Sequence, residues 1–583
     1  MHKLVLVLIS IALYSHSGFT QTLQPGKSVL PAFAVKYNTE EFGRNVFIFD
    51  PGMDRNEMQT LIDSLYNQQH PRSSEFGDNR YALLFKPGTY QLDIKVGYYT
   101  SIVGLGETPE EVVIRGILLS KGEQNGNVTC NFWRSVENIT FESPAGKLNI
   151  WGVSQAAPMR RAHIKGSIQL HDNGWASGGF LADSKVDDTI FAGGQQQWFT
   201  RNVDLGQWER GSWNMMFMGV PNAPEDKWPE NPYTVIDNTP MVREKPYLVI
   251  QGSEYLLKLP QIKKNSSGIS WQNKYFNEEV YPLEDFYIVN PITDNAVTLN
   301  SALSKGKNLF FLPGIYVMDE TLKINRTGTI VMGIGMATLR SGSGKPVFEI
   351  ADVDGVTLSG LIIDAGAIES ETLVRVGETN SGMNHEGNPS VLSDIFFRVG
   401  GYGEGKSASC MIINSNDVIV DHTWIWRADH GKNVGWDQNT TKNGLIVNGD
   451  NVTVYGLFCE HFHEYQTLWN GDGGKVYFYQ SEMPYDPPTA EAFRHGTING
   501  YASYKVADEV KSHEAWALGI YCVFFKAPVI VDQAIETPPQ LGKDIHHKII
   551  YWLYGGNKES KILSVINGKG GHVDFNTVKT VMD

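Results

Sequence analysis

Apolar residues in this chain occur in short runs, separated by clusters of glycine, asparagine and aspartate. Long helical patterns, with apolar positions every three or four residues, are scarce. Short apolar runs bounded by turn residues predict many short strands. In the second half of the chain, such strands are predicted at 353–364, 392–400, 416–426, 449–461 and 473–482.

The spacing of these strands predicts a right-handed parallel β-helix. Each begins with a turn residue and continues with β-branched or aromatic residues, and their reference positions are Val356, Ile395, Val418, Val452 and Val476. The steps between these positions are 39, 23, 34 and 24 residues. A step near 23 residues suits one coil of a β-helix, and a longer step suits a coil that carries a loop. A β-sandwich is the competing fold, but it would need hairpin turns every ~8–12 residues.

The same pattern occurs twice, which predicts two tandem β-helices. Residues 83–106 resemble residues 309–335, and residues 49–66 resemble residues 289–306, at offsets of 226 and 240 residues. Each copy contains a strand, a short helix, a Pro-Gly turn and a Gly-x-Gly corner, and we expect Asp54 and Asp294 to cap the two helices. The expected divisions are a signal peptide (1–20), a first β-helix (21–255), a linker (256–285) and a second β-helix with a C-terminal extension (286–583).

The first residues predict export. Lys3 precedes an apolar run of 10 residues, Leu4 to Leu13, and small and polar residues follow it. This run is too short to cross a bilayer but suits a secretory signal. No other segment approaches 18 consecutive apolar residues. We therefore expect a soluble protein that is secreted, to the periplasm or outside the cell, with no membrane partner.

Charge and cysteine content exclude several classes of protein. The net charge of −15 argues against nucleic acid and against polyanionic substrates. The 4 cysteines form no Cys-x-x-Cys pair, so a zinc ribbon is excluded, while one or two disulfides of unknown pairing remain open. The Gly-x-Gly corners lack the third glycine of a nucleotide-binding loop. No cofactor is expected. A monomer is the simplest expectation, although the sequence does not determine the oligomeric state.

Two glutamates stand out as candidates for catalysis. Glu460 follows Val452 by eight residues, and Glu482 follows Val476 by six. If each valine opens a coil, the glutamates lie at the same edge of coils stacked about 4.8 Å apart. Two carboxylates that close cannot both ionise freely, so the pKa of one should rise. A protonated carboxyl beside an ionised one is what cleavage of a glycosidic bond requires.

The segments around these glutamates resemble glycoside hydrolase family 55. The resemblance rests on "WIWRADHG" (424–431), "YGLFCEHFHEYQ" (455–466) and "YQSEMPY" (479–485), and more weakly on "SGGFLADS" (177–184) and "GQQQWFTRN" (194–202). It implies a pair of pectate-lyase-like β-helices and secreted, exo-acting hydrolysis of β-1,3-glucan. It also implies that Glu482 is the general acid and that Glu460 and Gln197 hold the attacking water. Ser481 and Met483 differ from the threonines expected in the family's motif.

Further side chains near these segments are candidates for binding a sugar. Aromatic rings can stack on the apolar faces of sugars, and His or Asp side chains can bond their hydroxyls. Burial inside the β-helix is the alternative for each tryptophan. A metal is not expected, because the His461-x-His463 pair has no third ligand at a suitable spacing. The expected substrate contacts are Trp424, Trp426, Trp469, Tyr485, His461, His463, Asp429 and His430.

The sequence is compatible with three functions. The leading hypothesis is an inverting hydrolase of a neutral glucan, with its site where the two β-helices meet and with Gln197 and Arg201 supplied by the first. The second is a polysaccharide lyase acting on uronic acids, with Asp352, Asp354 and Asp364 as calcium ligands. The third is a carbohydrate-binding β-helix without catalysis.

Overall fold

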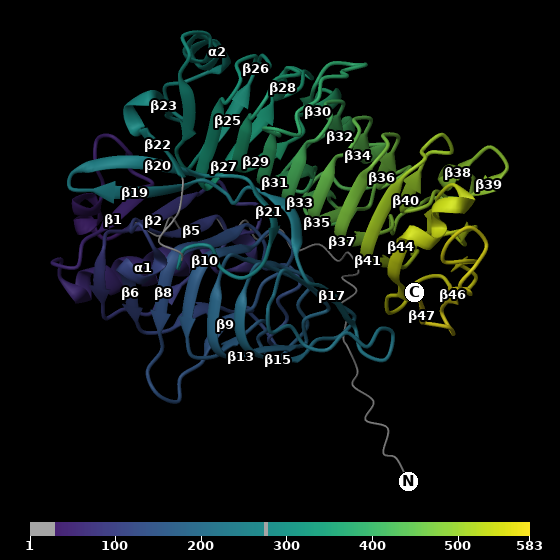
Figure 1. The fold of residues 1–583 in the computed structure, drawn as a ribbon, viewed down its shortest axis with the longest axis horizontal. Coiled ribbons are helices and arrows are strands. Elements are labelled where there is room, and N and C mark those ends of the chain that lie inside the picture. Colours follow the sequence, from purple (N-terminus) through teal and green to yellow (C-terminus); the bar gives the residue numbers. More distant parts are fainter. Residues whose placement is uncertain (1–29, 273–277) are drawn as a thin grey trace, which may run out of the picture.

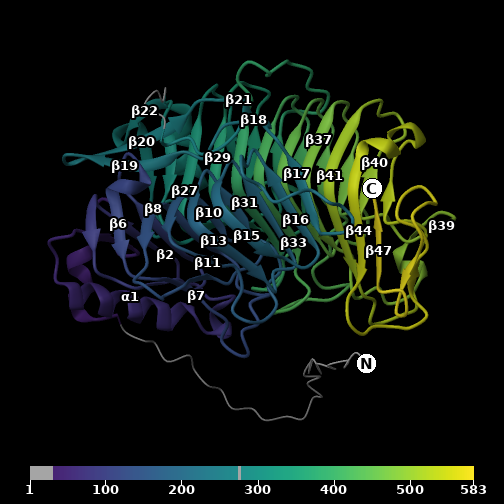
Figure 2. The same cartoon turned by 60° about the horizontal axis from the view of Figure 1, so that its bottom comes forward.

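The computed structural model describes residues 30–272 and 278–583. The expected signal peptide and residues 273–277 of the expected linker lie outside the described residues. The rest of the chain forms two β-helices that lie side by side, drawn in purple to blue and in teal to yellow in Figures 1 and 2. The expected all-β fold of two tandem right-handed parallel β-helices is confirmed.

Strands of the first β-helix belong to a 17-stranded sheet. One ladder of this sheet consists of parallel pairs only and faces the second β-helix. Its strands are β1 (Val46–Phe49), β2 (Tyr81–Phe85), β5 (Thr100–Gly104), β8 (Arg134–Glu142), β10 (Pro158–Lys165), β12 (Phe180–Ala182), β14 (Gln197–Arg201), β16 (Asn214–Met218) and β17 (Tyr233–Ile236).

The other sides of the first β-helix are shorter ladders in the same sheet. One contains β3 (Gly88–Tyr90), β6 (Val112–Arg115), β13 (Lys185–Gly193) and β15 (Asp204–Arg210). Another contains β4 (Ile94–Lys95), β7 (Leu118–Ser120), β9 (Asn149–Trp151) and β11 (Ile168–Gln169).

The second β-helix has a 12-stranded sheet that faces the first and an 8-stranded sheet behind it. The facing sheet is parallel up to its last strand, which pairs antiparallel. Its main path is β23 (Phe286–Val289), β24 (Asn308–Phe311), β27 (Ile330–Ser341), β29 (Thr357–Asp364), β31 (Val391–Val399), β33 (Ile419–Arg427), β35 (Thr453–Glu460), β37 (Gly474–Glu482), β41 (His513–Cys522), β44 (Ile545–Trp552) and β47 (Lys579–Met582), and β25 (Ile315–Met318) pairs with β27 off this path. The back sheet is β26 (Leu322–Ile324), β28 (Phe348–Ile350), β30 (Ser370–Val376), β32 (Ser407–Ile413), β34 (Asn443–Val447), β36 (Thr467–Trp469), β40 (Tyr504–Val506) and β43 (Ile535–Glu536).

A helix opens each half, as the duplicated pattern predicts, but only one of the expected caps is right. The Asp54 side chain accepts from the Glu57 amide at the start of α1 (Arg55–Gln69). At α2 (Ala296–Ser304) the cap is Asn295, which forms a capping box with Thr298. Asp294 instead accepts bonds from the Tyr287 hydroxyl and the Asn290 amide, so its carboxylate is already engaged.

Antiparallel strands connect the two β-helices. The first parallel ladder ends at Ile236 and the second begins at Phe286, so the parallel strands of the first half stop earlier than residue 255. Between them, β18 (Thr239–Val242) pairs with β21 (Lys263–Ser266), and β20 (Glu254–Pro260) pairs with both β19 (Tyr247–Gln251) and β22 (Glu278–Pro282).

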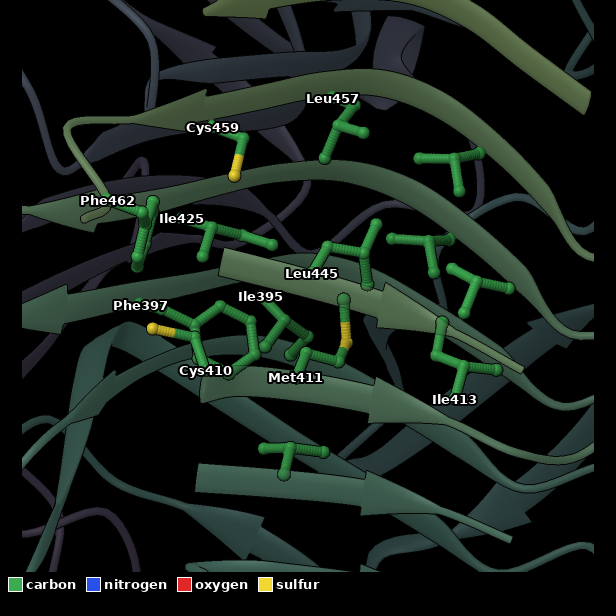
Figure 3. Packing of buried hydrophobic residues seen from close by; sticks show 14 of the residues in the cluster. Ile395, Phe397, Cys410, Met411, Ile413, Ile425, Leu445, Leu457, Cys459 and Phe462 are labelled. Carbon is green, nitrogen blue, oxygen red and sulfur yellow. The ribbon is translucent and has the colours of Figure 1, made fainter. Parts of the chain in front are cut away.

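Each β-helix encloses its own hydrophobic core. In the second, Phe397, Ile425 and Cys459 occupy the same register position on β31, β33 and β35, so their side chains form an interior column (Figure 3). Burial of such stacked apolar groups contributes about 25 cal/mol per Å² of surface removed from water. All four cysteines of the chain are free thiols, so neither possible disulfide is present.

A third apolar cluster joins the two β-helices. The Trp424 ring lies 4.5 Å from that of Phe132 (centroid to centroid), and the Phe478 ring stacks on Phe199 at 5.7 Å. Because these rings come from both β-helices, their burial favours one fixed arrangement of the two halves.

Buried ion pairs cross the same interface. Arg160 binds Asp394 through two nitrogens and Asp421 through a third contact, at 2.7–2.9 Å. Arg201 bonds Glu244 in bidentate fashion and also Asp421. All of these side chains are buried, so each charge depends on its partners to offset the loss of water. The expectation that Arg201 belongs to the active site is therefore wrong, because its guanidinium is committed to this network.

Strands of the facing sheet bend at a left-handed residue. Asp394, His422, Gly456, Phe478 and Ala517 all have positive φ, between 53° and 71°, on consecutive strands of the ladder. Register pairing skips this position in each pair of strands, so the bends lie next to one another. We call this row the corner column. Beyond it, alternate residues point into the core and out toward the first β-helix.

No helix in residues 30–272 and 278–583 combines the length and the apolar character needed to cross a membrane.

The interface network generates a stability prediction. In Asp421→Ala, two buried guanidinium groups lose a shared partner, so we expect the free energy of unfolding to fall by about 3–5 kcal/mol. Urea unfolding followed by fluorescence measures this. Arg115→Ala, which removes one partner of an exposed pair with Glu142, is the control and should change stability by less than about 1 kcal/mol. Equal effects of the two substitutions would contradict the role given to the network.

Candidate active site

The corner column places the two candidate glutamates side by side. Glu460 lies four residues after the bend at Gly456 on β35, and Glu482 lies four after the bend at Phe478 on β37. The two strands pair in parallel, with Phe458 opposite Gln480, and the His461 amide donates to the Glu482 carbonyl at 2.8 Å. Both side chains therefore point out of the sheet toward the first β-helix, from neighbouring rungs.

Glu460 is buried and held by donors from both halves of the chain. Its Oε1 accepts from Gln155 Nε2 at 2.9 Å, and its Oε2 accepts from Trp424 Nε1 at 2.9 Å. Burial raises the pKa of Glu460 to about 7, and the two donors oppose this by stabilising the carboxylate. Glu460 can thus exchange a proton near neutral pH.

Glu482 is the more accessible carboxyl, with 17% of its side chain exposed. Its Oε2 accepts from the Tyr485 hydroxyl, and its Oε1 lies 3.4 Å from Gln480 Nε2. Burial raises the pKa of Glu482 well above the usual value, and the negative charges of Glu460 and Asp429 raise it further. The raised pKa favours the protonated form of Glu482, which is the form a general acid needs.

His461 adjoins this acid as a neutral imidazole. Burial lowers the pKa of His461. Its Nδ1 lies 3.2 Å from the Met483 carbonyl, which fixes the proton on Nδ1 and leaves Nε2 bare. Nε2 faces Glu482 Oε2 at 4.0 Å and Asp429 Oδ1 at 3.9 Å.

Asp429 and His430 form a pair at the edge of the site. His430 Nδ1 lies 2.8 Å from Asp429 Oδ1, and its Nε2 lies 2.6 Å from Glu75 Oε1. The charge of His430 holds the pKa of Asp429 well below its usual range, and the two carboxylates raise the pKa of His430 well above 6.5. Asp429 is 30% exposed, so an ionised carboxylate is available beside the acid.

Gln197 connects to the glutamates through the first β-helix. Gln197 Nε2 donates to the Ser177 hydroxyl at 2.9 Å, Gln155 Nε2 lies 3.4 Å from the same oxygen, and Gln155 bonds Glu460. Within the described residues, the buried side-chain oxygens of this region that have no protein partner include Gln155 Oε1, Gln197 Oε1 and Gln480 Oε1. Such atoms need water or a ligand hydroxyl to bond.

Several expected sugar contacts lie elsewhere. Trp424 and Trp426 do share a face, but both are only 1% exposed and pack between the β-helices, so Trp424 acts on Glu460 through its N–H. Trp469 is fully buried inside the second β-helix against His513, because its side chain points into the core. These three rings cannot stack on a sugar in this arrangement.

The two histidines of the His461-x-His463 pair point in different directions. His461 has a φ of +72°, which ends the strand and breaks its alternation. The His463 ring packs on Trp436 at 4.2 Å, and burial lowers the pKa of His463 to about 3. The His463 ring therefore packs away from the glutamates, whereas Tyr485 lies against the His461 ring at 4.5 Å.

The expected calcium ligands of a lyase are engaged in other contacts. Asp364 is fully buried and binds Arg398 through two oxygens at 2.7 and 2.9 Å. Asp352 and Asp354 bracket His385, at 2.8 and 2.7 Å. The three carboxylates therefore neutralise protein cations.

Sequence reasoning missed Gln480, Gln155 and Ser177. Gln480 could have been found, because it lies two residues before Glu482 and so shares its face of the strand. Gln155 lies 305 residues from Glu460, its hydrogen-bond partner, and no local pattern indicates that contact.

Comparison with known proteins agrees with this fold. Residues 287–482 match the LAM55 pectate lyase-like domain. An exo-beta-1,3-glucanase of Streptomyces sp. (strain SirexAA-E / ActE) is 43% identical over 547 residues, 93% of this chain and 89% of the relative. The solved structure of sacteLam55A from Streptomyces sp. SirexAA-E superposes with a TM-score of 0.89 at 42% identity, covering 93% of this chain and 98% of that one.

A variant of sacteLam55A solved in complex with glucose matches with the same TM-score, identity and coverage. The parallel β-helices and these relatives place the chain among the β-helical glycoside hydrolases. The chain belongs to glycoside hydrolase family 55, whose motifs its sequence resembles.

The donors to Glu460 generate a prediction about pH. In Trp424→Phe the carboxylate loses a hydrogen bond that stabilises its ionised form, so the pKa of Glu460 should rise by about one unit. If Glu460 must lose its proton for activity, the acidic limb of kcat/KM should move up in pH by the same amount. The pH profile on a glucan measures this, with Trp436→Phe as the control. An unmoved limb would show that Glu460 does not set it.

Proposed function

We propose that this protein hydrolyses β-1,3-glucan by an inverting mechanism, with Glu482 as general acid and a water molecule held by Glu460 and Gln197 as nucleophile. The observation that carries hydrolysis by two carboxyls is the placement of both, with raised pKa values, on neighbouring rungs of one β-helix, facing the other. Inversion is proposed on side-chain divergence and the family resemblance, because rungs about 4.8 Å apart do not by themselves provide the ~6.5–9.5 Å that an inverting pair needs for its water. The choice of β-1,3-glucan is supported by the name of the 43% identical relative, an exo-beta-1,3-glucanase. Exo action is proposed on the same ground.

The chemistry begins at Glu482. Its proton passes to the glycosidic oxygen as the bond to the anomeric carbon breaks and positive charge develops on the sugar ring. The Tyr485 hydroxyl and Gln480 orient the carboxyl before transfer and stabilise the carboxylate after it. Asp429, ionised and partly exposed, is placed to accept a bond from a sugar hydroxyl.

Water attacks from the side of the first β-helix. Gln155 and Gln197 reach that side, and each has a buried oxygen that can accept a bond from water. Glu460 takes up the proton that the water releases, since burial brings its pKa to about 7. Glu460 thus serves as general base through a network that spans both halves of the chain.

The proposal also covers export and the two alternative functions. Export rests on the residue pattern at 1–20. A lyase is disfavoured because Asp352, Asp354 and Asp364 are engaged by protein cations. The non-catalytic alternative is disfavoured by membership in a glycoside hydrolase family.

Substitution of the acid tests the mechanism. Glu482→Gln keeps the shape of the side chain but cannot supply the proton, so hydrolysis of natural glucan should fall by about 10²- to 10⁴-fold. An aryl glycoside with a leaving group of low pKa, if it is accepted, should lose much less, because it departs without protonation. Glu464→Gln, a substitution in the loop after β35, is the matched control. Wild-type activity of Glu482→Gln on glucan, with an unchanged melting curve, would refute the assignment.

Product analysis tests the linkage and the stereochemistry separately. On a panel of β-1,3-, β-1,4- and mixed-linkage glucans and pectin, we expect sugar release from β-1,3-glucan. The first product seen by NMR should be the α-anomer, because water attacks opposite the leaving group. A β-anomer would indicate a retaining mechanism and remove Glu460 as base. An unsaturated product from pectin would instead establish a lyase.

A further inference from the structure

Beside the catalytic carboxyls lies a second cluster of chemically active side chains that hydrolysis does not use. Glu75, Cys130 and His430 each offer one ligand atom, and these atoms lie within 4.8 Å of one another. Glu75 follows α1, Cys130 precedes β8, and His430 follows β33, so the cluster bridges the two β-helices. Sulfur, imidazole nitrogen and carboxylate oxygen together form a donor set typical of zinc and similar divalent cations.

The cluster is already organised by its neighbours. The His430 ring is bonded at Nδ1 by Asp429, which directs Nε2 toward Glu75. A carboxylate behind a ligating histidine is the usual outer partner at zinc sites, where it orients the ring and makes it more basic. Aromatic rings of Phe76 and Trp426 pack on His430 at 5.8 and 5.2 Å and limit its rotation.

The other two ligands are also held in place. The Cys130 carbonyl accepts from the Tyr98 hydroxyl at 2.8 Å, which fixes the backbone that carries the thiol. Glu75 is 3% exposed, and its Oε2 binds Arg72 Nε at 2.5 Å, so Oε1 is the oxygen directed at His430.

We propose that Glu75, Cys130 and His430 form a binding site for one thiophilic divalent cation, such as Zn²⁺ or Cd²⁺, at the edge of the catalytic site. Glu75 Oε1, Cys130 Sγ and His430 Nε2 supply three ligands, and solvent supplies the fourth of a tetrahedral set. On binding, the thiol and the imidazolium each release their proton to solvent. The cation is then bound by His430, the residue directly after Asp429, and Asp429 lies beside Glu482.

Metal binding to the full-length protein tests this directly. Titration with Zn²⁺ in a buffer free of chelators should show one site per chain, and Cys130→Ser should weaken it by about tenfold or more. Cd²⁺ should produce an ultraviolet thiolate-to-metal absorption band in the wild type and none in Cys130→Ser. The three remaining cysteines are buried in the second β-helix, so they serve as an internal control.

Control variants distinguish this site from adventitious binding. His572→Ala removes an exposed histidine that lies 3.7 Å from Asp574, and it should leave the titration unchanged. Glu75→Gln should weaken binding even if Cys130→Ser fails to fold. The melting temperature of the wild type should rise with Zn²⁺, because the ligands come from both β-helices and are brought together only in the folded chain. No binding up to about 1 mM Zn²⁺, or equal affinity in wild type and Cys130→Ser, would overturn the proposal.

The readouts are independent of glucan hydrolysis. Loss of the metal site with intact hydrolysis would leave the catalytic assignment standing. Inactivity on every glucan, together with a Cd²⁺ band that depends on Cys130, would contradict the proposed hydrolysis and still support the metal site.

Discussion

Everything at the active site depends on the contact between the two β-helices. A single β-helix supplies only part of the surroundings of Glu460. Glu460 receives one donor from Gln155 in the first half and one from Trp424 in the second. The ring cluster and the Arg160 and Arg201 ion pairs hold the two facing sheets in one position, so those donors stay aligned. Separating the halves would expose Glu460 to water and return its pKa toward that of an ordinary glutamate.

The same interface explains how two neighbouring carboxyls acquire different roles. Glu460 is buried and has two donors that stabilise its charge, whereas the partly buried Glu482 faces the negative charges of Glu460 and Asp429. The two donors therefore favour the ionised form of Glu460, and the surrounding negative charges favour the protonated form of Glu482. Asp429 can remain ionised because His430 compensates it.

The sequence predicted the elements that repeat and failed where contacts are long-range. Coil spacing, the duplication and Asp54 are local signals, and they led to the fold and to Glu460 and Glu482 on adjacent coils. Asp294 was wrong because Asn295, its neighbour, is the residue whose side chain reaches the free amides of α2. Arg201 and Trp469 look suited to a sugar site, but the partners that bury them are distant in sequence. Gln155 could not be found, because only the packing of one β-helix on the other brings it to Glu460.

The corner column has a consequence for how such enzymes diverge. Glu460 and Glu482 each lie four residues after the left-handed bend of their own strand. The loops that border the site begin only where these strands end. A loop can therefore lengthen, shorten or change its sequence without moving either carboxyl. An insertion between bend and glutamate would turn the carboxyl into the core. The positions of the two carboxyls are thus encoded in the strands, whereas the loops supply the groups that tune them, such as Tyr485 and Asp429.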